Sequence, residues 1–269
     1  MNAARLAFGL LTALPVRRLP EVDRRSAGQA MLLAPVTTVP MLALLWGAHA
    51  AAEVGVPAAL SAALVVTAGT LYTRGMHLDG LADTADGLSC GYDAVASLRV
   101  LKQSDVGPSG VAAVVLALLL QVTALSALVP TSGGTVLAGV ALLASRHTLA
   151  WSCRRGVPPA QSGGLGAMVA GSVGATAALA AALVLALVSV LVSVLVSLAA
   201  PTWPARPPLL PAWASPLVTA AAGLGAGVLL RRRCVRRFGG VTGDVLGAGV
   251  EASLTVALVA AAVVHAAGG

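Results

Sequence analysis

Residues 174–199 read GATAALAAALVLALVSVLVSVLVSLA and contain no charged side chain. A helix needs about 20 predominantly apolar residues to cross the hydrocarbon core of a bilayer. The uncharged run around this stretch extends from 156 to 205. Five other uncharged runs cover residues 26–52, 54–73, 106–145, 207–230 and 252–269. Because 58% of the 269 residues are hydrophobic and only 10% are charged, against about 25% charged in a soluble domain, the composition excludes a soluble globular enzyme and a disordered chain.

The membrane segments are predicted to be helices. The runs consist of Ala, Leu, Val and Gly, without the alternation of polar and apolar residues that a closed barrel requires. We predict an all-α polytopic bundle of seven transmembrane helices, forming a single domain over residues 1–269. The predicted spans are 27–50, 55–74, 109–129, 134–152, 174–199, 211–230 and 245–266.

Basic residues set the expected orientation. If the N-terminus lies in the cytoplasm, 15 of the 17 basic residues fall in cytoplasmic segments, the exceptions being Arg146 within a span and Arg206 in an outer loop. This segregation is the positive-inside pattern of multi-pass membrane proteins. The net charge of +7 is therefore a topological signal, and we expect the lipid bilayer, and no nucleic acid, as a partner. The cluster Arg231–Arg237 is by default topogenic, and only a cytoplasmic polyanionic substrate would give it a second role.

Acidic residues concentrate after the second span. Asp79, Asp83 and Asp86 are separated by four and three positions, so on a helix they lie within roughly 60° of one another. Alone they would repel, whereas a divalent cation keeps all three ionised. The oxygen ligands predict Mg²⁺ or Mn²⁺; the alternative is a solvated acidic helix face. His77 falls on the opposite side of this helix and is not expected among the ligands.

The segment before the third span suggests phosphate binding. Lys102 and Ser104 precede a turn containing Gly107, and backbone N–H groups at a helix start attract phosphate oxygens. An ordinary helix-starting loop with a topogenic lysine is an equal alternative. Arg146, six residues inside the end of a span, is costly unless it faces a polar cavity or a carboxylate, although it could extend to the cytoplasmic face.

The last predicted span opens with acids as well. Asp244 and Glu251 are seven positions apart and therefore share a helix face. Two carboxylates entering the bilayer need a cation, which the metal centre or a clustered arginine would supply. The glycines around them allow neighbouring helices to approach closely.

Several motifs together resemble one family. The list in chain order is LLTALPV at 10–16, RGMHLDGLADTADGL at 74–88, KQSDVGPSG at 102–110, GLG at 164–166 and GGVTGDVLGA at 239–248. In order and spacing these are similar to the adenosylcobinamide-GDP ribazoletransferase, or cobalamin synthase, family of membrane enzymes. The chain departs from the family pattern at Gln103 and Val250.

The resemblance implies the last step of coenzyme B12 nucleotide-loop assembly at the bacterial inner membrane. In that step α-ribazole, or its 5'-phosphate, displaces GMP from adenosylcobinamide-GDP and gives adenosylcobalamin, or its 5'-phosphate, with Mg²⁺ required. The active-site segments would be 74–110 and 238–251, facing the cytoplasm. The expected catalytic and metal residues are Asp79, Asp83, Asp86 and Asp244. The expected substrate-binding residues are Lys102, Ser104, Arg146, Gly107 and Glu251.

Two other functions compete with this interpretation. Gly75, Asp79 and Asp83 have the spacing of the back half of the CDP-alcohol phosphotransferase signature, but the front half, which would fall at 61–66, is missing. An ion-coupled transporter would use intramembrane acids, yet here the acids cluster at one face of the bilayer and no inverted repeat is visible.

Overall fold

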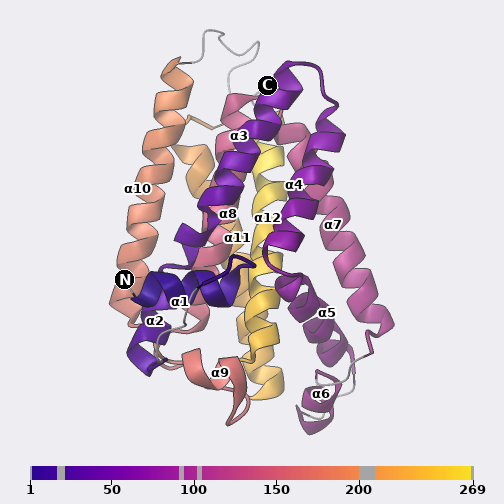
Figure 1. Cartoon of the computed structure of the whole chain (residues 1–269), viewed down its shortest axis with the longest axis vertical. Helices are drawn as coiled ribbons and strands as arrows, with labels where there is room; N and C mark the ends of the chain where they lie inside the picture. The colour runs from indigo at the N-terminus through magenta and orange to yellow at the C-terminus, as the bar shows by residue number, and fades with distance from the viewer. Residues whose placement is uncertain (1, 17–21, 91–93, 102–104, 200–209, 268–269) are drawn as a thin grey trace.

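The computed structural model describes residues 2–16, 22–90, 94–101, 105–199 and 210–267 (Figure 1). Regular structure in these ranges is helical, apart from two isolated β-bridges. The elements are α1 (Asn2–Leu11), α2 (Arg24–Leu32), the 3-10 helix η1 (Ala34–Thr38), α3 (Val39–Glu53), α4 (Ala58–Tyr72), α5 (Met76–Ser89), α6 (Ala94–Val100), α7 (Pro108–Leu128), α8 (Ser132–Ser152), α9 (Gly164–Val169), α10 (Ala175–Ala199), α11 (Ala214–Phe238) and α12 (Gly243–Ala266). The prediction of an all-α bundle is confirmed.

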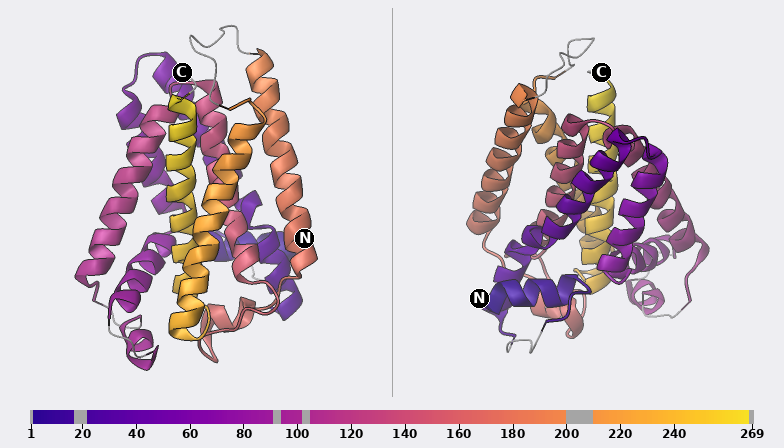
Figure 2. Two further views of the ribbon diagram at one scale, coloured as in Figure 1. Left: turned by 180° about the vertical axis from the view of Figure 1, so that it is seen from behind. Right: turned by 45° about the horizontal axis from the view of Figure 1, so that its top comes forward.

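Helix α12 is the centre of the bundle. It packs against α11, α8, α5 and α7, whereas α10 lies at the periphery against α8 and α11 (Figures 1 and 2). Small residues permit the close packing: a Cβ added to Gly223 of α11 would lie 2.8 Å from the Ser253 backbone oxygen and from the Ala257 Cβ of α12. Glycine at such crossings lets two helix backbones touch. Helix α12, whose first residues belong to the last motif, is thereby surrounded by four other helices.

Within the part of the chain that the structure describes, five segments are long and apolar enough to cross a membrane. They are Ala34–Glu53, Pro108–Leu128, Ala175–Ala199, Ala214–Phe238 and Gly243–Ala266. Helix α4 is apolar but shorter. Helix α8 matches the predicted span 134–152 but carries the buried polar residues Ser145, Arg146, His147 and Thr148. It faces other helices over most of its surface, so it does not need the lipid-compatible composition of α10.

The first predicted span is shorter than expected. Residues 27–32 belong to α2, a separate helix, and the apolar segment begins at Ala34. Pro35 and Pro40 explain the break, because proline lacks the N–H that a continuing helix would need. They lie instead in the first turns of η1 and α3, where that N–H has no helical partner.

The two ends of the bundle differ. Helices α1, α2, α5, α6 and α9 gather at the end drawn lowest in Figure 1, here called the lower end, and the C-terminus lies at the opposite end. The basic residues at the end of α11 also lie at the lower end. The predicted orientation would place this end in the cytoplasm.

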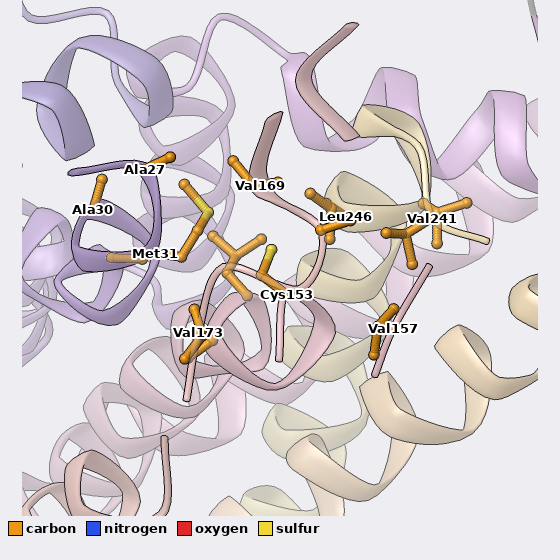
Figure 3. Close-up of a cluster of buried hydrophobic side chains, with 14 of the residues drawn as sticks. Ala27, Ala30, Met31, Cys153, Val157, Val169, Val173, Val241 and Leu246 are labelled. Atoms are coloured by element: carbon orange, nitrogen blue, oxygen red, sulfur yellow. The ribbon is translucent and has the colours of Figure 1, made fainter. Parts of the chain in front are cut away.

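A buried apolar cluster fixes the lower end (Figure 3). Met31 of α2, Cys153 and Val173 on either side of α9, and Val241 and Leu246 around the start of α12 belong to it. Backbone hydrogen bonds reinforce the contact: the Val241 N–H donates to the Pro158 oxygen (3.0 Å), and the Ala160 N–H donates to the Val241 oxygen (3.0 Å). The turn that leads into α12 is therefore paired with the segment 158–160 through both backbone groups of Val241.

Candidate active site

Helix α5 begins at an unusual turn. Arg74 (φ 57°) and Gly75 (φ 69°) both adopt left-handed backbone conformations, which cost energy for arginine but little for glycine. The chain leaves α4 through this turn and starts α5 at Met76. The helix carries Asp79 exposed, Asp83 half-buried and Asp86 buried, so the three predicted aspartates are on one helix but in different environments.

Close contact between α5 and α12 brings Asp79 and Asp244 to one hollow. A Cβ on Gly80 would lie 2.6 Å from the Asp244 backbone oxygen, and a Cβ on Gly247 would lie 3.2 Å from the His77 Cα. Asp79 and Asp244 line an open hollow of about 390 Å³ at the lower end. The other lining residues are Met76, Leu101, Gln161, Gly163, Gly164, Leu165, Gly166, Val241, Thr242 and Gly243. We call this the aspartate hollow.

Thr242 orients Asp244 at the start of α12. Its hydroxyl oxygen accepts the Val245 N–H (3.2 Å), which caps the helix, and its hydroxyl donates to the Asp244 carboxylate (3.2 Å). Threonine at this position is a favoured helix cap. The cap and the hydroxyl contact together hold one carboxylate of the hollow at a helix start.

Negative charge accumulates beside the aspartate hollow. Partial burial, followed by the charges of Asp79, Asp244 and Asp86, raises the pKa of Asp83 to about 6. Within the described ranges, no three His, Cys, Asp or Glu side chains are gathered closely enough to hold a metal ion. Mg²⁺, however, is commonly bound through one or two carboxylates together with substrate phosphates and waters. The donor set of Asp79 and Asp244, with Asp83 nearby, fits that ion.

Asp86 has a different partner from the one predicted. Its two carboxylate oxygens accept the backbone N–H groups of Gly107 (2.7 Å) and Gly110 (2.8 Å), which begin α7. The first N–H groups of a helix have no partner within it and need an acceptor. Asp86, predicted as a metal ligand, therefore caps α7, and Gly107, predicted to bind substrate, donates to Asp86.

Arg146 and Glu251 line one internal cavity, away from the aspartate hollow. Arg146 is buried and its Nη1 lies 2.9 Å from Nε2 of His77, while Glu251 accepts a hydrogen bond from Nε2 of Gln121 (2.8 Å). Arg146, Glu251 and Gln121 line an internal cavity of about 60 Å³. This cavity and carboxylate are the surroundings that an arginine within a span requires. The structure thus places these two predicted substrate-binding residues in the bundle interior.

His77 is a residue whose role the spacing did not reveal. Burial first, and then the charge of Arg146, hold the pKa of His77 well below its ordinary value. The neutral imidazole can accept a hydrogen bond from the guanidinium. An arginine inside a span signals a missing partner, but only the packing of α5 and α8 against α12 identifies that partner as His77.

A second hollow adjoins the first. It has a volume of about 670 Å³ and lies between α5 and α7. Its lining is Arg74, Gly75, Met76, Leu78, Asp79, Ala82, Val106, Val111, Val114 and Val115. Met76 and Asp79 belong to both hollows, so Asp79 stands where a polar hollow and a largely apolar one meet. Lys102 and Ser104, the remaining predicted site residues, lie outside the described residues.

Comparison with known proteins covers nearly the whole chain. The family model described as cobalamin-5-phosphate synthase matches residues 3–262. A protein of Nocardioides sp. named adenosylcobinamide-GDP ribazoletransferase is 39% identical over 260 residues, which cover 96% of this chain and 97% of that relative. Relatives with the same name from Frankia casuarinae (38% identical, 96% of this chain and 93% of the relative) and Pseudomonas putida (34%, 94% and 96%) also match.

No solved structure matches the chain. The range matched by the family model contains all the motifs quoted above, including those that form the aspartate hollow. The chain belongs to the cobalamin-5-phosphate synthase family.

Proposed function

We propose that this chain is a membrane-bound adenosylcobinamide-GDP ribazoletransferase. It joins adenosylcobinamide-GDP to α-ribazole or α-ribazole 5'-phosphate, releases GMP, and forms adenosylcobalamin or its 5'-phosphate. Support comes from the family match over residues 3–262 and from the name shared by relatives that align along almost their full length. The family match favours this function over a CDP-alcohol phosphotransferase and over a transporter.

The position of Asp79 carries the structural part of the proposal. A reaction between two large substrates needs two binding volumes that meet where the bond is made. Asp79 lines both the aspartate hollow and the apolar hollow beside α7. The two substrates are therefore proposed to approach Asp79 from the two hollows.

The proposed reaction is a displacement at phosphorus. The ribose hydroxyl oxygen of α-ribazole forms a bond to the phosphorus on the cobinamide side of the diphosphate, and the bond from that phosphorus to the bridging oxygen breaks. GMP leaves with the bridging oxygen, and a carboxylate of the aspartate hollow accepts the hydroxyl proton as general base. Asp79 and Asp244 are the residues that would hold Mg²⁺, which supplies neutralisation of the diphosphate charge when bound.

Residues around the hollow position these carboxylates. Thr242 fixes the start of α12 and contacts Asp244, and Gly80 allows α5 to lie against Asp244. Asp86 anchors the start of α7, which forms the wall of the second hollow. We place this end of the bundle on the cytoplasmic side of the bacterial inner membrane, because the basic residues at the end of α11 favour that orientation.

The direct test is GMP release by the purified chain in detergent, supplied with adenosylcobinamide-GDP and α-ribazole, with and without Mg²⁺. Asp79→Asn, which removes the carboxylate that lines both hollows, should lower GMP release by roughly a hundredfold or more while the variant still inserts into membranes. Asp105→Asn is the matched control, because Asp105 is exposed and lines neither hollow; it should behave as wild type. Near-normal GMP release by Asp79→Asn would refute the assignment of the site.

A further inference from the structure

A third hollow lies at the lower end, beside the end of α11. Its volume is about 450 Å³, and it shares no lining residue with the aspartate hollow or with the hollow beside α7. Four arginines line it, namely Arg154 from the segment after α8 and Arg231, Arg232 and Arg236 from α11. We call this hollow the arginine pocket.

The arginine pocket lacks anionic partners among the residues that the structure describes. Arg231 is only 6% exposed, and the buried Nε atoms of Arg231 and Arg154 have no hydrogen-bond partner among the described residues. No carboxylate in the described ranges lies within 4.0 Å of any of the four guanidinium groups. A buried charge without a partner is costly, so the pocket is complete only when an anion enters it.

Other arginines of the lower end show the contrast. Arg24 donates to the Ala170 oxygen (2.8 Å) and Arg237 donates to the Cys90 oxygen (2.6 Å), so protein acceptors hold them. Arg155 and Arg233, the neighbours of Arg154 and Arg232, are exposed and do not line the pocket. Exposed arginines such as these two are sufficient to set the orientation of the chain in the membrane. The orientation signal therefore does not explain why Arg231 is buried and lines the pocket.

The chemistry of the pocket selects a phosphate group. Guanidinium groups bind phosphate through paired hydrogen bonds, and Leu229 and Val235 add apolar surface beside the arginines. Basic pockets between transmembrane helices are typical sites for acidic headgroups. We propose that Arg154, Arg231, Arg232 and Arg236 form a phosphate-binding site, separate from the aspartate hollow, for either the headgroup of an acidic phospholipid or a free phosphate-bearing molecule.

An occupied pocket would brace the turn into α12. Pro158 lines the arginine pocket, and its oxygen accepts the Val241 N–H, three positions before Asp244. A ligand that binds only the folded state stabilises that state. Occupancy should therefore raise the unfolding temperature of the chain, a readout that does not depend on the proposed ribazole transfer.

Two probes distinguish the sources of phosphate. The first is a comparison of nanodiscs made of phosphatidylcholine alone with nanodiscs that also contain phosphatidylglycerol, with bound lipid detected by native mass spectrometry. The second is inorganic phosphate or pyrophosphate added to lipid-free protein in neutral detergent, with the unfolding temperature recorded. Binding of phosphatidylglycerol assigns the site to a headgroup, and a rise in unfolding temperature with pyrophosphate assigns it to a free ligand.

Matched double variants test the site itself. Arg154→Gln with Arg231→Gln should bind the effective probe at least about tenfold more weakly than wild type, since each charge-assisted hydrogen bond contributes strongly. Arg155→Gln with Arg233→Gln removes the same charge outside the pocket and should bind as wild type. Because Arg231 is buried, its replacement could impair folding. Arg232 and Arg236 are exposed, so the double variant Arg232→Gln with Arg236→Gln provides a second test in which misfolding is less of a concern.

Two results would overturn the proposal. One is that neither probe binds wild type more tightly than the pocket variants. The other is that the Arg155 and Arg233 control loses as much binding as the pocket variants, because the attraction would then be a diffuse surface charge.

Discussion

Gly80 of α5 lies directly against the backbone of Asp244 in α12. The space between them is so small that a Cβ on Gly80 would come within 2.6 Å of the Asp244 oxygen. Two family motifs far apart in the sequence meet at this contact, and Asp79 and Asp244 line one hollow as a result. The contact makes glycine at position 80 a requirement of the site.

The first prediction concerns this contact. Gly80→Ala should push α5 away from α12, because a backbone atom cannot yield as a flexible side chain can, and overpacking costs about 1–3 kcal/mol. We expect a lower unfolding temperature and a large loss of GMP release. Gly225→Ala in α11 is the control, since a Cβ there meets nothing within 4 Å. A Gly80→Ala variant with wild-type activity would contradict the proposed packing of the site.

The second prediction separates the capping aspartate from the aspartates that we propose to hold Mg²⁺. Asp86→Ala removes the acceptor of two helix-start N–H groups, and a lost cap costs about 1 kcal/mol, more when the N–H groups are buried. We expect Asp86→Ala to lower the unfolding temperature.

Asp86→Asn keeps one acceptor oxygen and should leave the Mg²⁺ concentration for half-maximal GMP release close to that of wild type. A several-fold rise in that concentration for Asp86→Asn would instead show that Asp86 binds the metal.

The third prediction concerns metal dependence. Asp79→Asn and Asp244→Asn each remove a negatively charged oxygen ligand, so both should raise the Mg²⁺ concentration for half-maximal GMP release and lower the maximal rate by roughly a hundredfold or more. Removal of Mg²⁺ from wild type with EDTA should stop GMP release, and added Mg²⁺ should restore it. Unchanged GMP release in EDTA would exclude the proposed metal role.

The fourth prediction concerns Arg146 and Glu251, two buried residues of opposite charge that line the same cavity without a direct ion pair. Removing one of two buried opposite charges destabilises the fold, because the charge that remains buried is then less well compensated. Arg146→Gln and Glu251→Gln should therefore each reduce the fraction of folded protein that survives heating in detergent.

The double variant of Arg146 and Glu251 should lose less than the sum of the single variants, as a double-mutant cycle can measure. Additive losses would show that the two side chains do not interact. His77→Ala, which removes the hydrogen-bond partner of Arg146, should also destabilise the protein but leave the Mg²⁺ requirement near that of wild type.

Much of the fold follows from local sequence. Long uncharged runs predict membrane helices because the hydrocarbon core leaves few alternatives, and the spacing of Asp79, Asp83 and Asp86 predicts one helix that carries all three. The first span begins at Ala34 and not at the predicted residue 27, because Pro35 and Pro40 interrupt the helix. Hydropathy alone does not reveal this, since it takes no account of the backbone N–H that proline lacks.

Tertiary structure decided which side chains meet. Helical periodicity gives the direction of Asp86 but does not reveal that the start of α7 supplies its partners, and it does not reveal that Gly80 admits Asp244. From the sequence, Arg231 is one of the basic residues that set the membrane orientation. Only the packing of α11 beside the segment after α8 shows that Arg231 lines a pocket. The physical reason is that hydrophobicity and helix period act over neighbouring residues, whereas these partners depend on contacts between distant helices.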